Sequence, residues 1–371
     1  MVGTAGALAA GQRTASAAAS KFRVYFGGYT GGTSDSKGIY VADFDAATGD
    51  FGLPMLAVEA ASPSFLEIHP SGKYVYAVGE GDGSVRAFSV RPDGQMNLIN
   101  RVASKGKGPC HINIDKTGKV AVVAYYESGS AASFLIKDDG SLGETASFVQ
   151  HEGHGVDKER QAGPHAHSAN FSPDNRFVFI CDLGLDKVFS YKLDAGTGAL
   201  TPNGFGTCPP GAGPRHLAFS TSGSHVFVNN EIALTETTFA YDAAHGTLKA
   251  LDTVSVLPKN VPFSPTYSTA ETRVHPNGKW VYVSVRTHDS IARLNFEEAT
   301  GKLTHVGNTP SGGKTPRNFN IDPSGKWLFA AHQDSGNVVL FEIDQTSGDL
   351  KPTGREQHVS ACVCVRFLPL P

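Results

Sequence analysis

Two histidines lie two residues apart in the segment Gly163-Pro164-His165-Ala166-His167, where a turn leads into an apolar stretch. In an extended segment residues i and i+2 point to the same side, so we expect His165 and His167 to face a common space. Imidazole titrates near neutral pH and can accept or release a proton during a reaction. The pair is therefore a candidate for acid–base catalysis, with two capping or core histidines as the structural alternative.

Three arginines lie near the start of similar strand-like segments, in Gly213-Pro214-Arg215-His216, Ala270-Glu271-Thr272-Arg273 and Thr315-Pro316-Arg317-Asn318. A guanidinium group is always charged and is costly to bury without an anionic partner. These residues therefore predict an anionic ligand or an oxyanion formed during a reaction. Arg286 joins them in this interpretation. The alternative is that each arginine pairs with an acidic residue of a neighbouring repeat.

A second set of polar residues stands where the following apolar segments end: Glu80, Asp182, Glu231 and His332. A carboxylate beside arginines stays ionised, so it can orient water or a histidine or act as a general base. It can equally serve as a salt-bridge partner. We favour Glu231 for chemistry because it belongs to the same repeat as Arg215. We assign Asp182, Arg286, Arg317 and His332 to substrate binding.

The elements that position these residues form an internal repeat. A polar residue followed by a glycine turn recurs seven times at intervals of roughly fifty residues, a period typical of propellers. These turns are Asp45–Phe51, Pro92–Met96, Asp138–Leu142, Asp194–Leu200, Asp242–Leu248, Glu298–Leu303 and Asp344–Leu350.

Between these turns a strand–turn–strand pattern occurs six times. Its apolar residues alternate, and no comparably long helical period is present. The six copies begin at Phe65, His111, Ser168, His216, Thr272 and Asn318. About four strands per repeat match one propeller blade, so we predict an all-β, seven-bladed β-propeller.

The two ends of the chain supply the strands that the seventh blade still needs. Ala361–Phe367 has the pattern of an inner strand and Phe22–Phe26 that of the strand beside it. Pairing them closes the ring and removes its exposed edges. We expect one propeller domain over 21–371, preceded by an arm at 1–20 that is disordered or the remnant of an export signal, since Ala17-Ala18-Ala19 resembles a cleavage site.

Composition excludes several functions. The net charge of -3 and the lack of a lysine or arginine run argue against nucleic acid, and no apolar run is long enough to span a membrane. No P-loop or Gly-x-Ser-x-Gly motif occurs. His151, His154, His165 and His167 could bind a metal, but we expect neither metal nor cofactor, and the insertion at 150–163 instead forms a lip over the site.

The chain resembles the seven-bladed propeller lactonases, the family that includes propeller-type 6-phosphogluconolactonase and the fungal carboxy-muconate lactonising enzyme. The similarity runs from about Phe22 to Phe367. Its most specific motifs are Gly27-Gly28-Tyr29-Thr30, Gly163-Pro164-His165-Ala166-His167, Asp182-Leu183-Gly184-Leu185-Asp186-Lys187-Val188, Gly213-Pro214-Arg215-His216, Asn230-Glu231 and Thr315-Pro316-Arg317-Asn318-Phe319. The resemblance implies an active site at one mouth of the channel, with His165 or His167, Arg215, Glu231 and Arg273 as catalytic residues.

The resemblance also implies hydrolysis of a small anionic sugar lactone, 6-phosphogluconolactone, in the pentose phosphate pathway. In this scheme Glu231 or a histidine of the 165/167 pair is the base, Arg215 and Arg273 stabilise the oxyanion, and Arg317 anchors a phosphate or carboxylate. A carboxymuconate-type cycloisomerase and a non-catalytic binding propeller stay open. We expect a cytoplasmic monomer, or a periplasmic one if Met1–Ser20 is part of an export signal.

Overall fold

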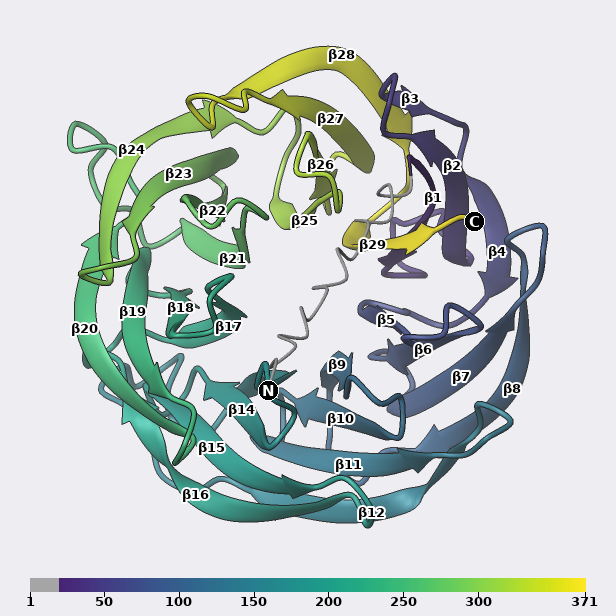
Figure 1. The fold of residues 1–371 in the computed structure, drawn as a ribbon, viewed down its shortest axis with the longest axis horizontal. Coiled ribbons are helices and arrows are strands. Elements are labelled where there is room, and N and C mark those ends of the chain that lie inside the picture. Colours follow the sequence, from purple (N-terminus) through teal and green to yellow (C-terminus); the bar gives the residue numbers. More distant parts are fainter. Residues whose placement is uncertain (1–19) are drawn as a thin grey trace, which may run out of the picture.

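The computed structural model describes residues 20–371, which form 29 strands in seven antiparallel sheets arranged radially around one axis (Figure 1). This confirms the predicted all-β, seven-bladed propeller. No helix within the described range is long and apolar enough to cross a membrane. The predicted N-terminal arm, apart from Ser20, lies outside the described residues.

Each blade runs from an inner strand at the axis to an outer strand at the rim. The inner strands are β5 (Leu66–Ile68), β9 (Pro109–Ile114), β13 (Ala166–Phe171), β17 (Pro214–Phe219), β21 (Ser268–Val274), β25 (Pro316–Ile321) and β29 (Cys362–Pro369). The second strands are β1 (Lys21–Gly28), β6 (Tyr74–Gly79), β10 (Val120–Tyr125), β14 (Phe177–Asp182), β18 (His225–Asn230), β22 (Trp280–Arg286) and β26 (Trp327–His332).

The outer half of each blade completes the sheet. The third strands are β2 (Gly38–Asp45), β7 (Ser84–Val90), β11 (Ser130–Ile136), β15 (Lys187–Asp194), β19 (Thr235–Asp242), β23 (Ser290–Glu297) and β27 (Asn337–Ile343). The rim strands are β3 (Asp50–Phe51), β4 (Met55–Glu59), β8 (Met96–Ala103), β12 (Leu142–Gln150), β16 (Ala199–Thr207), β20 (Thr247–Ser255), β24 (Lys302–Pro310) and β28 (Leu350–His358).

The two ends of the chain meet in one blade, as predicted. Strand β29 pairs antiparallel with β1, with Val365 opposite Phe26, and Figure 1 shows yellow β29 beside purple β1. Because the last strand is hydrogen-bonded to the first, the ring is closed by a full ladder rather than by side-chain packing alone.

The seven glycine turns join the third strand of each blade to its rim strand. The glycine in each turn has a left-handed φ between 68° and 88°, at Gly49, Gly94, Gly140, Gly198, Gly246, Gly301 and Gly348. A side chain would be strained in this conformation, which explains why glycine recurs there. The turns also bind the adjacent blade, since Tyr76 donates a hydrogen bond of 2.8 Å to the carbonyl of Gly140.

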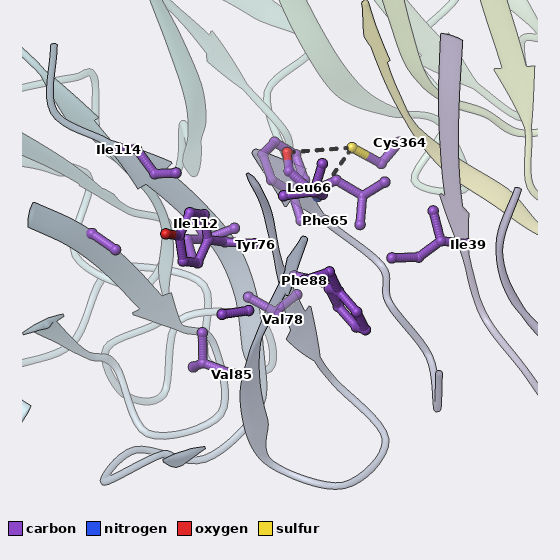
Figure 2. Packing of buried hydrophobic residues seen from close by; sticks show 14 of the residues in the cluster. Ile39, Phe65, Leu66, Tyr76, Val78, Val85, Phe88, Ile112, Ile114 and Cys364 are labelled. Carbon is purple, nitrogen blue, oxygen red and sulfur yellow. Dashed lines mark hydrogen bonds between the residues drawn. The ribbon is translucent and has the colours of Figure 1, made fainter. Parts of the chain in front are cut away.

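The hydrophobic core lies between neighbouring blades. Figure 2 shows one such cluster, in which buried Leu66 and Tyr76 pack with Ile39 from the terminal blade and Ile112 from the next blade. On the other side of the closure, the rings of Phe44 and Phe329 meet edge to face at 4.8 Å. Aromatic and aliphatic packing between blades fixes their relative positions, and so the positions of the inner strands that carry the site.

Candidate active site

A β-bulge near the start of the inner strands aims one side chain per blade at the axis. In β13 the ladder skips His167 between Ala166 and Ser168, and in β17 it skips Arg215 between Pro214 and His216. The same irregularity falls at the positions of Cys110, Arg317 and Val363. A bulge residue has no ladder partner and can be re-aimed. These five residues line one space at the axis.

A second set of equivalent residues follows the second strands. The N–H groups of Tyr29, Glu80, Tyr126 and Glu231 each donate to the carbonyl of a residue just before the inner strand. Arg286 is the equivalent residue in the blade of β21–β24. The residue before it, Val285, pairs with Thr269, just as Asn230, the residue before Glu231, pairs with Pro214. All five of these side chains line the axial space or the cavity above it.

The cavity has a volume of about 390 Å³. Its lining residues come from the bulge positions, from the ends of the second strands and from the loop after β12: Glu80, Cys110, Tyr126, Arg160, His167, Glu231, Ser268, Arg286 and Arg317. A cavity of this size that is lined by charged groups suits a small polar ligand.

Glu231 is the electrostatic centre of the cavity wall. Its Oε2 lies 2.9 Å from Arg215 Nε and 3.0 Å from Arg286 Nη2, and its Oε1 lies 2.6 Å from Arg160 Nη2. Burial would raise the pKa of the Glu231 carboxyl, but the neighbouring guanidinium groups hold it well below its usual range. Glu231 is thus ionised at neutral pH and suited to holding arginines rather than to accepting a proton.

The arginines beside Glu231 are held by further contacts. Arg215 is 2% exposed and donates from Nη1 to the carbonyl of Ala270. Burial lowers its pKa, as does the charge of Arg317, while Glu231 opposes both. Burial also lowers the pKa of Arg286 to about 10, again against the effect of Glu231. Both groups stay charged at neutral pH.

His167 combines access to the cavity with a neutral ring. It is 5% exposed and contributes to both the cavity and the axial space. Burial, Arg215 and His216 hold the pKa of the His167 imidazole well below its usual range. The ring is therefore unprotonated at neutral pH and able to accept a proton.

His165 does not share this position. It precedes β13, its Nδ1 donates to the carbonyl of Tyr126 at 2.9 Å, and its ring stacks on that of Tyr126. His165 is absent from the residues that line the described cavity. The alternation expected for an extended strand does not hold here, because His165 precedes β13 and the bulge falls at His167. Both rings contact the ring of Tyr126, but only His167 lines the described cavity.

Arg317 differs from the other arginines of the cavity. Within residues 20–371 it forms no salt bridge shorter than 4.0 Å, and its guanidinium lies over the ring of Tyr29 at 5.6 Å. Its pKa is raised: burial lowers it, but Tyr29 and Glu80 outweigh that effect. A charged group that faces a cavity without a carboxylate partner is suited to bind an anion.

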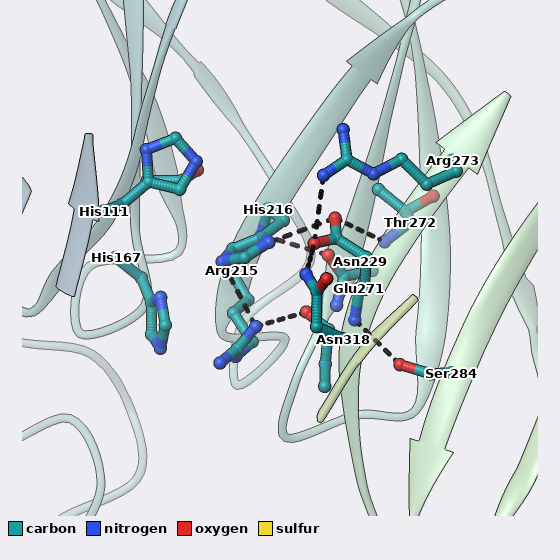
Figure 3. Close-up of polar contacts among 12 residues, drawn as sticks. His111, His167, Arg215, His216, Asn229, Glu271, Thr272, Arg273, Ser284 and Asn318 are labelled. Carbon is teal, nitrogen blue, oxygen red and sulfur yellow. Dashed lines mark hydrogen bonds and ion pairs between the residues drawn. The ribbon is translucent and has the colours of Figure 1, made fainter. Parts of the chain in front are cut away.

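A network of polar contacts extends from Arg215 through His216 to Glu271 and Asn318 (Figure 3). Arg215 Nη1 donates to His216 Nε2 at 3.2 Å, and His216 Nδ1 lies 3.2 Å from Glu271 Oε1. Asn318 donates to the other oxygen of Glu271 at 2.5 Å. This arrangement fits a neutral His216 imidazole and supports Arg215.

Arg273 belongs to this network and not to the cavity. It pairs with Glu271 at 3.3 Å, and it is absent from the residues lining the described cavity. In β21 the residue equivalent to Arg215 is Ala270, because Thr269 pairs with Val285 as Pro214 pairs with Asn230. Arg273 thus lies three residues beyond the position that corresponds to Arg215, although the sequence analysis grouped the two arginines at the start of similar segments.

Asp182 and His332 also stand outside the cavity, for a related reason. They pair with Ala166 and Pro316, as Asn230 pairs with Pro214. They therefore precede the Glu231 position by one residue, and a shift of one residue in a strand turns the side chain to the other face.

The contacts of these two side chains are internal. Asp182 is fully buried and accepts hydrogen bonds from the backbone N–H groups of His165 and Gly184, and its other oxygen lies 2.6 Å from His151. His332 Nδ1 donates to the carbonyl of Asn337 at 3.1 Å. Neither is placed to contact a ligand in the cavity.

The structure adds residues that the sequence analysis did not assign. Arg160 comes from the insertion after β12, whose role as a lip was expected without a named side chain. Tyr126 and Cys110 also line the cavity, as does Glu80, which ranked below Glu231. Tyr126 and Glu80 could have been found from the sequence, because each directly follows the second strand of its blade, as Glu231 does.

The four clustered histidines are dispersed in the fold. His151 binds Asp182 and Tyr191, while His154 is exposed and contacts the carbonyl of Gly155. Across residues 20–371 no group of three or more His, Cys, Asp or Glu side chains is placed to hold a metal ion.

The closed seven-bladed propeller, with a neutral histidine and several guanidinium groups around a cavity at one end of its axis, has the fold and the kind of site of a propeller enzyme. More particularly, the chain belongs to the lactonase family of seven-bladed β-propellers, whose family model matches residues 23–367. Membership confirms the resemblance seen in the sequence and identifies the protein as a carboxylic ester hydrolase of the lactonase class.

Known relatives cover most of the chain. A 6-phosphogluconolactonase of Bacillus subtilis is 33% identical over 94% of this chain and 99% of its own length. A 6-phosphogluconolactonase of Formosa agariphila is 34% identical over 79% and 86%. Among solved structures, a periplasmic gluconolactonase of Pseudomonas aeruginosa is 27% identical, with a TM-score of 0.86 over 95% of this chain and all of the other.

Proposed function

We propose that the protein hydrolyses 6-phosphogluconolactone to 6-phosphogluconate in this cavity. The observation that carries the proposal is Arg317, a guanidinium group with no salt bridge to the described chain that faces the cavity together with His167. Two relatives named 6-phosphogluconolactonase, at 33% and 34% identity, support the choice of substrate.

The charge of the site supports a substrate with more than one negative charge. Within the described chain, four guanidinium groups face two carboxylates around the cavity and the axial space, which leaves an excess of two positive charges when the histidines are neutral. These groups are Arg160, Arg215, Arg286 and Arg317 against Glu80 and Glu231. A phosphate monoester carries about -1.5 to -2 at pH 7 and would balance that excess.

In the proposed reaction His167 accepts a proton from water as the water oxygen attacks the lactone carbonyl. The carbonyl oxygen becomes an oxyanion, which N–H groups of Arg215 and Arg286 stabilise. When the ring C–O bond breaks, the imidazolium of His167 returns the proton to the leaving alkoxide. Glu231 holds the arginines, and Arg317 anchors the phosphate. His165, Arg273, Asp182 and His332 have no part in this scheme.

The direct test measures loss of 6-phosphogluconolactone with and without the protein, because this lactone also opens spontaneously. We expect clear acceleration over the spontaneous rate and no conversion of a carboxymuconate to its lactone. A rate equal to the spontaneous one would refute the proposed activity, and conversion of carboxymuconate would favour the cycloisomerase.

We also propose that the protein works as a cytoplasmic monomer. The relative named periplasmic makes the periplasm the alternative, and Ala17-Ala18-Ala19, which would decide between the two, lies outside the described residues. Light scattering of the purified protein tests the monomer. Cell fractionation combined with mass spectrometry of the mature N-terminus tests the compartment, since removal of the first residues would indicate export.

A further inference from the structure

Arg160 has a different origin from the other guanidinium groups of the cavity. Arg286 and Arg317 line the cavity from strands β22 and β25, and Arg215 lines the adjoining axial space from β17, whereas Arg160 lies on the loop of residues 151–165 between β12 and β13. Within the described chain it is thus the one cavity guanidinium that the propeller scaffold does not itself supply.

The loop is built to hold Arg160 in place. Gln161 is fully buried, and its amide nitrogen donates to the carbonyl of Leu183 at 2.8 Å and to Asp186 Oδ1 at 2.7 Å. Its amide oxygen accepts from the N–H groups of Val156 and Asp157, both at 3.1 Å. A buried amide that satisfies four partners fixes the loop, because losing any of them would leave a buried polar group unpaired.

The turn that presents Arg160 is also fixed. Asp157 Oδ1 accepts hydrogen bonds from the N–H groups of Glu159 and Arg160 at 2.9 and 3.0 Å. Asp186, which holds Gln161, also accepts from the N–H of Gly213 at 2.9 Å, directly before the Pro214-Arg215 strand start. The loop and the Arg215 blade therefore share one anchoring carboxylate.

Of the three arginines that contact Glu231, Arg160 is the one that can most readily turn from Glu231 to a bound ligand. Glu231 already neutralises two strand-borne guanidinium groups through Oε2, and it meets Arg160 through Oε1 alone. The side chain of Arg160 is 44% exposed, against 3% for Arg215 and 11% for Arg286. Because Glu231 keeps Arg215 and Arg286 as partners, Arg160 can exchange its carboxylate oxygen for a phosphate oxygen without leaving the buried carboxylate unpaired.

We propose that Arg160 binds the anionic group of the substrate, which lies at a distance from the lactone carbonyl. Together with Arg317, Arg160 thereby selects phosphorylated lactones over uncharged ones. This inference rests on the proposed function and assigns a specificity-determining role to a loop residue. A phosphate offers three oxygens, so two guanidinium groups from different elements can bind it at once.

The test compares the Arg160→Gln variant with the unmodified protein on 6-phosphogluconolactone and on uncharged gluconolactone. We expect kcat/KM for the phosphorylated lactone to fall about 10- to 100-fold, mainly through KM, because a charge-assisted pair is lost. Activity on gluconolactone should stay within about twofold. Lys158→Gln, an exposed cation of the same loop, is the matched control and should change neither activity.

A binding measurement separates this inference from the proposed function. Calorimetric titration with 6-phosphogluconate and with gluconate should show a preference for the phosphorylated acid that Arg160→Gln reduces about 10-fold or more. Equal losses on both ligands, or an unchanged preference, would overturn the role of Arg160. If the unmodified protein hydrolyses neither lactone but still prefers the phosphorylated acid, the proposed activity is rejected while the binding role of Arg160 stands.

Discussion

Arg215 Nε lies 2.9 Å from Glu231 Oε2, an ion pair made within one blade between the bulge residue of β17 and the residue that follows β18. The pair joins the two positions that supply most of the cavity wall. Because Arg160 and Arg286 bind the same carboxylate, Glu231 acts as a common counter-ion that offsets part of the repulsion among these guanidinium groups.

Replacing Arg215 tests its proposed role at the oxyanion. Arg215→Ala should lower kcat/KM for 6-phosphogluconolactone by about two to three orders of magnitude, the usual loss for one oxyanion donor. Steady-state kinetics measure the effect, with Arg91→Ala on the exposed Arg91–Asp93 pair as the control. Normal turnover by a variant that keeps its thermal transition would remove Arg215 from the mechanism.

The two histidines of the 165/167 pair should separate in a mutational test. His167→Gln removes the only proposed base and should lower kcat about 100-fold or more. His165→Gln is the matched control: the His165 ring stacks on Tyr126 but does not itself line the described cavity, so activity should stay within about threefold. Similar losses in both variants would contradict the assignment of His167 as the base.

The sequence was sufficient for the fold because the repeat is local. The glycine turns and the alternating apolar strands are each readable within one blade, and the closure by β29 and β1 follows from counting the strands that are left over. The site was harder to predict, because which side chain points inward depends on single-residue irregularities that leave no clear mark in the sequence.

Particular residues show this limit. The bulge brings Arg215 and Arg317 to the axis, but in β21 the same irregularity falls at Ala270 and leaves Arg273 three residues below. Asp182 precedes the Glu231 position by one residue and so faces another side. Arg160 depends on the path of a loop that no periodic pattern describes.

Arg317→Gln should weaken substrate binding without weakening the fold. Because the guanidinium has no salt bridge within the described chain and contacts only the ring of Tyr29, its removal leaves no salt-bridged carboxylate unpaired, and the thermal midpoint should change little. KM for 6-phosphogluconolactone should rise about 10- to 100-fold. Competitive inhibition by inorganic phosphate should weaken in parallel. An unchanged KM would exclude Arg317 as the phosphate anchor.

Arg273→Gln provides the opposite expectation for another arginine of the axis. Since Arg273 contacts Glu271 and does not line the described cavity, kcat and KM should each stay within about threefold of the unmodified protein. The same kinetic assay measures this. A loss as large as that of Arg215→Ala would restore Arg273 to the catalytic group that the family resemblance implied.

The buried histidines should make the fold sensitive to mild acid. Burial is the main cause that holds the pKa values of His111, His167 and His216 well below 6.5 in the folded protein. Below pH 6.5 the unfolded chain therefore binds protons that the folded chain does not. The contribution of these histidines to the free energy of unfolding is therefore fully present above about pH 6.5. Below that pH it falls by about 1.4 kcal/mol per pH unit for each histidine.

Urea unfolding at pH 8, 7, 6 and 5 measures this dependence. We expect the midpoint to fall from pH 7 towards pH 5, because three histidines outnumber buried Glu236, whose raised pKa acts in the opposite direction. Glu231 contributes little in this range because its carboxyl is ionised in the folded protein and largely ionised in the unfolded chain. His111→Gln removes one titrating group, so it should flatten the slope below pH 6.5 whatever its effect on absolute stability. His154→Gln, at an exposed position of the loop, should leave the slope unchanged. A midpoint that does not vary between pH 7 and 5 would show that these imidazoles bind protons alike in the folded and unfolded chains, which would contradict the lowered pKa of the His167 imidazole.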